Sequence, residues 1–232
     1  SRTYQQSSRA TEEMLVRDPE NRLLARGSRF RLPAWMIRDG ALRASGLFNP
    51  VVGGPPVRPY QPAGVWEELF MGRYSYQPSL GGAQYRRTVY AFWRRSSAPT
   101  FLFDSAQRRV CEVRQNRTNT PLQALTMMND ETILDASREL ARQACAATAD
   151  EGERIQFLSR RILSRDLEQA DVERMVKFKQ ESVKQLREGG EFLQKIGQLK
   201  ELRKDENVDA EVSAYFLAAS LLFNLDEAIT RE

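Results

Sequence analysis

The sequence predicts a mainly α-helical protein, an irregular multi-helix bundle with a long Gly/Pro-rich loop region and at most one short β-hairpin. Apolar residues recur at helical spacing through most of residues 119–232, whereas glycine and proline cluster in residues 48–79. We therefore expect one fused domain with two halves: a loop-rich, arginine- and aromatic-dense half over residues 1–118 and a helical bundle half over residues 119–232. At 232 residues, of which 41% are apolar and 28% charged, the chain is long enough to bury a core.

The first half is expected to contain one longer helix, at residues 34–45, which Gly46 ends. Its buried side is expected to consist of Trp35, Ile37, Ala41 and Leu42. Arg38 and Asp39 are expected to be more exposed. Together with Arg31, these two charged residues either line a pocket or form a buried ion network.

The rest of the first half is expected to be mostly loop. A short helix at residues 65–71 interrupts the Gly/Pro-rich stretch, whose aromatic side chains could form the walls of a binding site: Tyr60, Trp66, Tyr74 and Tyr76. Residues 84–93 fit one helical face but also contain strand-forming residues, and we favour a helix because no partner strand is evident nearby. Residues 101–104 could pair with residues 109–113 as the one short hairpin.

The second half begins at a well-specified helix start. Thr120 is a good N-cap, Pro121 suits the first helical position, and Gln123 can return a hydrogen bond to the cap, which completes a capping box. The apolar residues that follow at helical spacing are expected to face a core: Leu122, Leu125 and Met128. Asp130 is expected to cap the next helix.

Several further helices are expected after that start. Apolar residues at helical spacing place them at residues 133–144, 151–164, 169–188 and 192–202. A last helix, over residues 212–225 and capped by Asp209, is apolar on nearly every face. We therefore expect this last helix to lie at the centre of the bundle.

Composition excludes several functional classes. The chain contains no histidine, which excludes Ser-His-Asp and Cys-His catalysis and histidine ligands for a metal or haem from within the chain. Cys111 and Cys145 lie too far apart in sequence for a metal or haem attachment motif, although they could form one disulfide. No metal site or cofactor is predicted in this chain. The net charge of +4 does not by itself argue for nucleic-acid binding, and no apolar run is long enough to span a membrane.

The loop before Thr120 and the arginines near it form the candidate binding region. Helix starts favour anions because their first N–H groups are free and the helix dipole is positive there. Two interpretations stay open: this region holds an anionic ligand or an acidic partner, or its polar side chains only tie the loop down. The candidate residues are Arg86, Arg94, Arg114, Arg117, Thr118 and Asn119.

Three carboxylates are candidates for general acid and base catalysis, namely Asp39, Asp104 and Asp130. Hydrolysis of a glycosidic bond needs only two carboxylates at a suitable separation, so the missing histidine does not forbid it. Because the chain has many carboxylates, no sequence pattern singles out a pair.

Several motifs occur in order along nearly the whole chain. They are TYQQSS at residues 3–8, RDPENR at 17–22, FRLP at 30–33, IRD at 37–39, RRTVYAFWRR at 86–95, FD at 103–104, CEVR at 111–114, RTNTPLQAL at 117–125 and NLDE at 224–227. Together these motifs resemble the C-terminal domain of unknown function of planctomycete-type exported cytochrome-associated proteins. In that family the domain usually follows a c-type cytochrome domain and a second planctomycete-specific domain.

The resemblance implies that the chain is a fragment of a larger exported protein, periplasmic or at the cell surface. It implies upstream domains of the same protein as partners, with another exported protein or a carbohydrate as further candidates, and a haem c in an upstream domain. The first functional hypothesis is a non-catalytic helical scaffold or binding domain. The alternative is part of a polysaccharide-acting enzyme that uses the carboxylates above, or of an oxidoreductase whose haem is supplied upstream.

Overall fold

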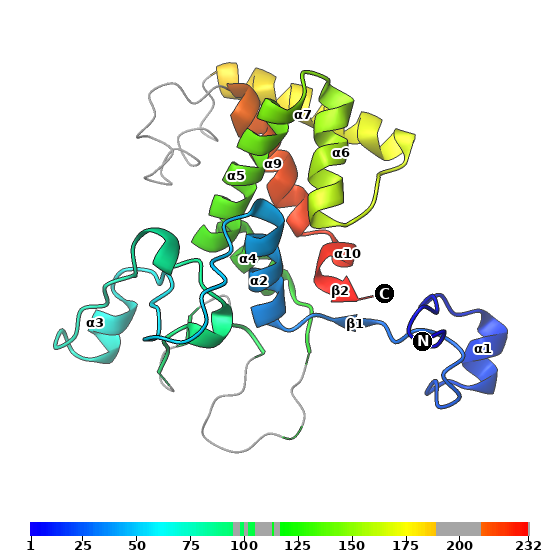
Figure 1. Ribbon diagram of the computed structural model, residues 1–232, viewed down its shortest axis with the longest axis horizontal. Helices are drawn as coiled ribbons and strands as arrows, with labels where there is room; N and C mark the ends of the chain where they lie inside the picture. The colour runs from blue at the N-terminus through cyan, green and yellow to red at the C-terminus, as the bar shows by residue number, and fades with distance from the viewer. Residues whose placement is uncertain (95–97, 100–101, 105–112, 114–116, 189–209, 232) are drawn as a thin grey trace.

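The computed structural model describes residues 1–94, 98–99, 102–104, 113, 117–188 and 210–231, and the fold is mainly helical (Figure 1). Within these ranges there are nine α-helices, two short 3₁₀-helices and one two-stranded antiparallel sheet. The α-helices are α1 (Glu12–Arg17), α2 (Ala34–Ser45), α3 (Val65–Leu69), α4 (Pro121–Asn129), α5 (Glu131–Ala147), α6 (Glu151–Ile162), α7 (Gln169–Arg187), α9 (Ala210–Phe223) and α10 (Asp226–Ile229). The 3₁₀-helices are Gly81–Ala83 and Thr88–Tyr90, and the strands are β1 (Phe30–Arg31) and β2 (Thr230–Arg231). The predicted fold class is confirmed.

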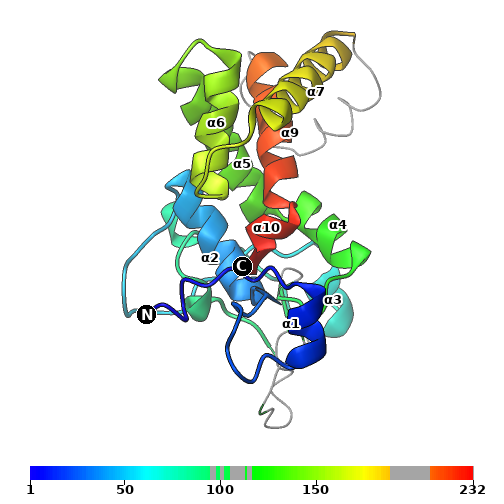
Figure 2. The same cartoon turned by 90° about the vertical axis from the view of Figure 1, so that its right-hand side faces the viewer.

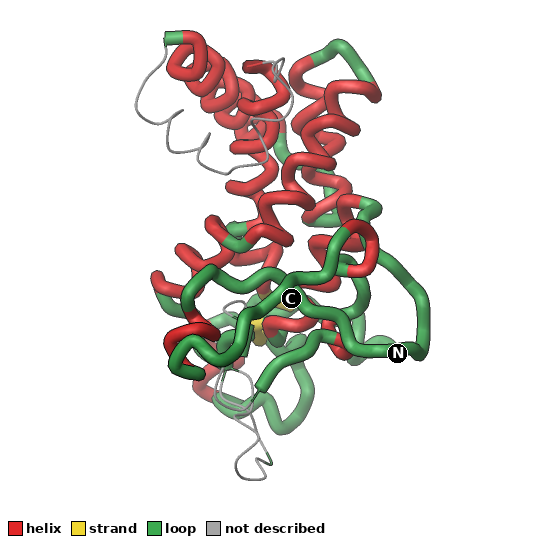
Figure 3. Tube along the Cα trace, turned by 90° about the vertical axis from the view of Figure 1, so that its left-hand side faces the viewer, coloured by secondary structure: helices red, strands yellow, loops and turns green. Residues whose placement is uncertain are grey.

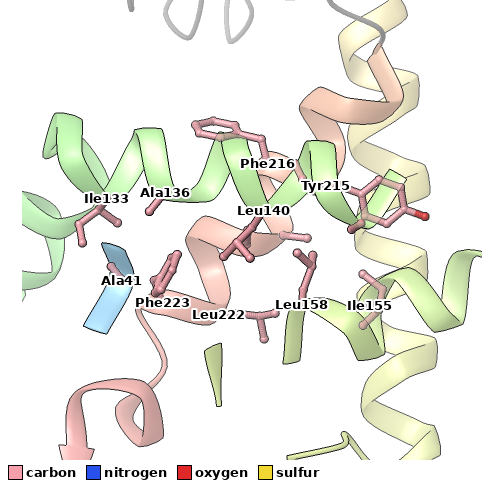
Figure 4. Close-up of a cluster of buried hydrophobic side chains, with 14 of the residues drawn as sticks. Ala41, Ile133, Ala136, Leu140, Ile155, Leu158, Tyr215, Phe216, Leu222 and Phe223 are labelled. Carbon is pink, nitrogen blue, oxygen red and sulfur yellow. The ribbon is translucent and has the colours of Figure 1, made fainter. Parts of the chain in front are cut away.

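The helical half is organised around α9. This helix packs against α5, α6 and α7, and Figures 1 and 2 show these four helices together at one end of the molecule. Half of the residues of α9 are buried, as expected for a helix that is apolar on all sides: Ala214, Tyr215, Phe216, Ala218, Ala219, Leu222 and Phe223. Figure 4 shows Leu140 of α5, Leu158 of α6 and Leu222 of α9 gathered in this main core. The predicted central position of the last helix is confirmed.

The helix starts of this half are fixed locally, as predicted. Thr120 Oγ1 accepts a hydrogen bond from the N–H of Gln123 at 3.3 Å, and Gln123 Oε1 accepts one from the N–H of Thr120 at 3.2 Å. Asp130 Oδ1 accepts hydrogen bonds from the first free N–H groups of α5, those of Thr132 at 3.0 Å and Ile133 at 3.3 Å. These bonds satisfy donors that a helix start leaves without a partner.

The loop-rich half is joined to the bundle through α2 and the small sheet. Helix α2 contacts α5, α6 and the 3₁₀-helix at Thr88–Tyr90. Strand β1 pairs with β2, so that Phe30 lies opposite Arg231, and Figure 3 shows this sheet in yellow near the C-terminal end. A second, small core cluster lies beside the sheet and consists of Ile37, Met127 and Ile229.

The Gly/Pro-rich loops enclose an aromatic cluster of their own. The Trp66 side chain is fully buried, and its ring stacks on Phe70, Tyr76 and Phe92 with ring centroids 5.0–6.0 Å apart. The expected role of Trp66 in the wall of a binding site is therefore wrong. Its ring is the centre of a small core, which these loops need because they have little regular backbone pairing.

Two further expectations for the first half are wrong. In α2, Trp35 is 46% exposed, although it is expected on the buried side. The Arg38 side chain is only 3% exposed, although it is expected to be more exposed. In residues 84–93 only Thr88–Tyr90 is helical, because the backbone bonds to other loops. The N–H of Val57 donates to the carbonyl of Tyr90 at 2.9 Å, and the N–H of Phe92 donates to the carbonyl of Val57 at 2.7 Å.

The orientation of α4 also differs from the expectation. Leu122, Leu125 and Met128 are 71%, 56% and 45% exposed, so the predicted apolar face does not point into a core. Gln123 and Met127, one turn apart, are buried instead. The helix turns its Gln123 side toward Arg31, because a buried guanidinium needs hydrogen-bond acceptors.

Some predictions lie outside the described residues. They are most of the hairpin of residues 101–104 with 109–113, the helix at 192–202, the Asp209 cap and the Cys111 partner of a disulfide. The sheet that is described joins β1 and β2, which come from opposite ends of the chain. No helix among the described residues is long and apolar enough to cross a membrane.

The central position of α9 gives a first test. Leu222→Ala should lower the free energy of unfolding by about 2–5 kcal/mol, because it leaves a cavity in the main core. Leu122→Ala makes the same chemical change at an exposed site and should cost about 0.5 kcal/mol or less. Urea unfolding of both variants measures the difference, and equal costs would contradict this core.

A charged cluster that ties α6 and α7 to α9 gives a second test. The buried Lys179 Nζ donates to Glu151 Oε1 at 2.6 Å and to Glu211 Oε1 at 3.3 Å. Hydrogen bonds from Lys179, which has the larger effect, and from Gln180 lower the pKa of Glu151 below its usual 4.5. A carboxyl whose pKa is lowered by folding stabilises the protein above its unfolded pKa, and this contribution is lost as the pH falls through the folded pKa.

Glu151→Gln should therefore lower the free energy of unfolding at pH 7 by less than ~1 kcal/mol, since Glu151 is partly exposed and screened by solvent. The difference from the wild type should shrink as the pH falls below 4.5. Urea unfolding across this pH range measures it. A difference that stays constant with pH would show that the ionised Glu151 does not stabilise the fold.

Candidate functional site

The residues ahead of α4 form a hydrogen-bonded cluster around Arg31. This arginine lies on β1 and is 8% exposed. Its Nη1 donates to the carbonyl oxygen of Thr118 at 2.5 Å and to Oε1 of Gln123. The guanidinium carbon also lies 4.7 Å from the centre of the Phe103 ring. The strand pairing of β1 with β2 thus places a buried cation directly at the start of α4.

Asp104 completes this cluster from the other side. Its Oδ2 accepts hydrogen bonds from the N–H of Thr118 at 2.7 Å and from Nε2 of Gln123 at 3.2 Å. The Thr118 hydroxyl donates to the same carboxylate at 2.9 Å and accepts from Gln123 Nε2 at 2.8 Å. Asp104 has a left-handed backbone with φ of 58°, which aspartate tolerates better than most residues. The Gln123 amide therefore connects the capping box, the Asp104 carboxylate and Arg31.

The electrostatics of Arg31 reflect its burial. Burial lowers the pKa of the guanidinium, and the charges of Asp104 and Asp226 oppose that shift without cancelling it. Among the described residues, Nε and Nη2 of Arg31 have no hydrogen-bond partner. A buried guanidinium of this kind depends on the few partners it has.

An exposed surface lies next to this buried cluster. We use the name α4 face for the side chains of Leu122, Leu125 and Met128, which are all exposed. Arg117 and Asn119, just before the helix, are exposed as well. The Arg117 guanidinium carbon lies 4.5 Å from the centre of the Phe30 ring. The start of α4 thus presents apolar side chains beside a cationic and polar edge.

A second cluster surrounds Arg38 on α2. Its Nη1 donates to the carbonyl oxygen of Arg86 at 3.0 Å and to Thr88 Oγ1 at 3.2 Å, and its Nη2 donates to the carbonyl oxygen of Gln84 at 2.6 Å. Asp39 Oδ1 accepts from the N–H of Thr88 at 2.8 Å and from its hydroxyl at 2.6 Å. Of the two sequence interpretations for Arg38 and Asp39, the buried polar network describes this arrangement.

Arg86 extends the network into the Gly/Pro-rich loops. It is buried, and its guanidinium donates to the carbonyl oxygens of Pro55 at 2.9 Å, Val51 at 3.2 Å and Gly53. The guanidinium carbon lies 4.0 Å from the centre of the Tyr90 ring. These contacts fix the loop backbone and leave Arg86 little exposed surface for a ligand.

Asp130 lies near Arg38 at the other end of α4. It is buried, and its carboxylate caps α5. Burial raises the pKa of Asp130, while the charge of Arg38 and the hydrogen bonds of the cap partly oppose that rise. Asp39 and Asp130 therefore share the Arg38 region, whereas Asp104 belongs to the Arg31 cluster.

The remaining candidates are spread over the surface. Arg94 is exposed and lies 5.0 Å from the centre of the Phe70 ring, at the aromatic cluster. Arg114 lies outside the described residues. Of the candidate binding residues, the structure brings Arg117, Thr118 and Asn119 to one place and leaves Arg86 and Arg94 in the loop-rich half. The site predictions themselves stay predictions.

Sequence reasoning missed the contact between Arg31 and Gln123. The sequence predicts a capping-box role for Gln123, and the spacing of the motif gives no sign that its side-chain oxygen also accepts a hydrogen bond from a buried arginine. Among the described residues, no three Cys, Asp or Glu side chains gather as a metal site would require.

Comparison with known proteins identifies a family for this chain. A family model described as "PSD1: Protein of unknown function (DUF1553)" matches residues 1–179. This match includes the Arg31 and Arg38 clusters and the α4 face, and it ends within α7, before α9. No curated protein and no solved structure matches the chain.

The Arg31 cluster gives a third test. Gln123→Leu should lower the free energy of unfolding by about 2–3 kcal/mol, because it removes a charge-assisted hydrogen bond and leaves Arg31 buried with fewer acceptors. Asn119→Ala, at an exposed position of the same segment, should change it by about 0.5 kcal/mol at most. Thermal and urea unfolding measure both variants. If Gln123→Leu is as stable as Asn119→Ala, the cluster does not stabilise the start of α4.

Proposed function

Because the chain belongs to the PSD1 (DUF1553) family, the domain found in planctomycete cytochrome-associated proteins, we propose that it is a non-catalytic helical scaffold and binding domain of such a protein. Its partner is another domain of the same protein, which binds at the α4 face. The proposal also places the protein outside the cytoplasm, in the periplasm or at the cell surface. Any haem c is carried by a different domain.

The exposure of the α4 face is the observation that supports this proposal. Three large apolar side chains, Leu122, Leu125 and Met128, share one side of a nine-residue helix and are 71%, 56% and 45% exposed. A soluble protein rarely presents a contiguous apolar surface unless a partner covers it. Single exposed apolar residues are ordinary, but here they repeat at helical spacing on one element.

The residues beneath this face hold it rigidly. The capping box of Thr120 and Gln123 fixes the first turn of α4, and Arg31 and Asp104 fix the segment before it. A surface that is already ordered loses little conformational entropy when a partner binds. The buried polar network therefore prepares the exposed apolar face for binding.

The edge of the face indicates the charge of the partner. Arg117 is exposed beside the first turn of α4, and the Phe30 ring under its guanidinium restricts where it lies. A partner with apolar residues at its centre and a carboxylate at its rim would match this edge.

The polar chemistry of the site favours this function over hydrolysis of a polysaccharide. Asp39, Asp104 and Asp130 each accept at least one backbone N–H, and two of them lie in a different cluster from the third. The buried Trp66 ring has no free face on which a sugar could stack. These contacts use the carboxylates and the tryptophan for structure.

The proposal is tested by replacing the α4 face as a whole. The triple variant Leu122→Ser, Leu125→Ser and Met128→Ser should keep the thermal stability of the wild type, because all three side chains are exposed. Its affinity for the cytochrome-bearing remainder of the same protein should fall by about 30-fold or more, as expected for loss of an apolar interface centre. Titration calorimetry or surface plasmon resonance measures this affinity.

Val52→Ser is the matched control, since Val52 is also exposed but lies in a loop far along the chain from α4. It should bind like the wild type. Wild-type affinity in the triple variant would reject the α4 face as the binding surface. Turnover of a polysaccharide by the whole protein that depends on Asp104 or Asp130 would reject the non-catalytic function.

A further inference from the structure

A cavity of about 470 Å³ is lined by residues of α2 and the end of α6, together with single residues of α9 and α10. Its floor is apolar and includes Ile37, Ala41 and Phe223, all of them buried. Ala41 and Phe223 belong to the main core, whereas Ile37 belongs to the small cluster beside the sheet. The cavity therefore opens where the two cores adjoin, and none of the residues of α4 lines it.

The volume of this cavity lies within the range of sites for small ligands, which measure about 300–1,000 Å³. Residues from several separate elements line it, including Leu32 after β1 and Ala228 of α10.

Gly40 in α2 leaves additional room in this cavity. It lies inside a helix and lines the cavity, and a Cβ added there would meet no atom within 4 Å. Glycine in a helix interior costs about 1 kcal/mol relative to alanine. Neither crowding nor a left-handed backbone requires glycine at this position.

The rim of the cavity is positively charged. Arg43, Arg160 and Arg161 line it, and the described lining contains no aspartate or glutamate. Arg160 is paired with Asp166 at 2.5 Å and Glu153 at 3.3 Å.

The other two arginines of the rim lack a carboxylate partner among the described residues. Arg161 donates to the Gln143 amide oxygen at 3.2 Å and lies 5.8 Å from the centre of the Phe157 ring. The Arg43 side chain is exposed and makes no hydrogen bond or ion pair with a described residue. Two guanidinium groups above an apolar floor are complementary to a ligand with an anionic head and an apolar body.

We propose that this cavity binds a small organic anion of that kind, an alkyl or aryl carboxylate. The apolar body lies against Ile37, Ala41 and Phe223, and the carboxylate lies at the rim between Arg43 and Arg161. This site goes beyond the proposed binding of another domain at the α4 face and does not depend on it.

Decanoate is the probe, and decanol is its uncharged counterpart of equal chain length. Calorimetric titration of the complete chain should show binding of decanoate and much weaker binding of decanol, because only decanoate can pair with the arginines. The double variant Arg43→Gln and Arg161→Gln should bind decanoate at least about tenfold more weakly. Arg174→Gln removes an exposed arginine of α7 and should bind like the wild type.

A series at Gly40 tests the location independently of charge. Gly40→Ala adds one methyl group in open space and should bind decanoate nearly as well as the wild type. Gly40→Leu places a large apolar side chain at the wall of the cavity and should weaken decanoate binding at least about tenfold while the helix gains stability. Thermal unfolding checks that each variant is folded.

Several results would overturn this inference. They are equal affinity for decanol and decanoate, undiminished binding by Gly40→Leu, undiminished binding by the double arginine variant, and absence of decanoate binding to the wild type. Capture of an acidic peptide without any decanoate binding would also overturn it, because the occupant would then be a polypeptide.

Discussion

The loop-rich half of this domain depends on hydrogen bonds from buried arginine side chains to backbone carbonyls. Arg38 reaches from α2 to the carbonyls of Gln84 and Arg86, and Arg86 in turn reaches those of Val51, Gly53 and Pro55. Carbonyls in a helix or sheet find partners in the backbone, but the described part of these loops has little regular pairing beyond isolated bridges, the short helix α3 and the 3₁₀-helices. A guanidinium group offers five donors in a fixed plane, so one side chain can fix several turns of a loop. The ordered conformation of these loops therefore depends on Arg38 of α2.

The same principle explains why α4 presents its apolar side to solvent. Arg31 needs acceptors, and the turn of α4 that carries Gln123 provides one. Once that side faces inward, Leu122 and Leu125 must face outward. The polar network around Arg31 thus stabilises the start of α4, while the apolar α4 face stays exposed and free to bind a partner. This division is what we expect of a domain that folds on its own contacts and binds a neighbour through a prepared helix face.

Sequence reasoning succeeded where a few neighbouring residues decide the structure. The caps at Thr120 and Asp130 depend on neighbouring residues, and the central position of α9 follows from its apolar composition. These features could therefore be predicted from the sequence. The burial of Arg38 and the orientation of α4 could not be predicted, because each depends on a partner far along the chain. Nothing in the local sequence distinguishes a buried arginine from an exposed one. The sequence names Arg31 only beside Arg38 and Asp39, whereas in the structure it lies at the start of α4, next to the predicted candidate segment of Arg117 to Asn119. The cavity beneath Arg43 was also beyond reach, since it arises from four elements meeting in space.

The central claim is that Arg38 holds the Gly/Pro-rich loops on α2. Hydrogen exchange of backbone amides, compared between the wild type and Arg38→Lys, tests it most directly, since lysine keeps the charge but lacks the planar set of donors. The account predicts faster exchange in residues 49–57 and 84–92, with unchanged exchange in α5 and α9. Unchanged exchange in those loops, or an equal increase throughout α5 and α9, would contradict it.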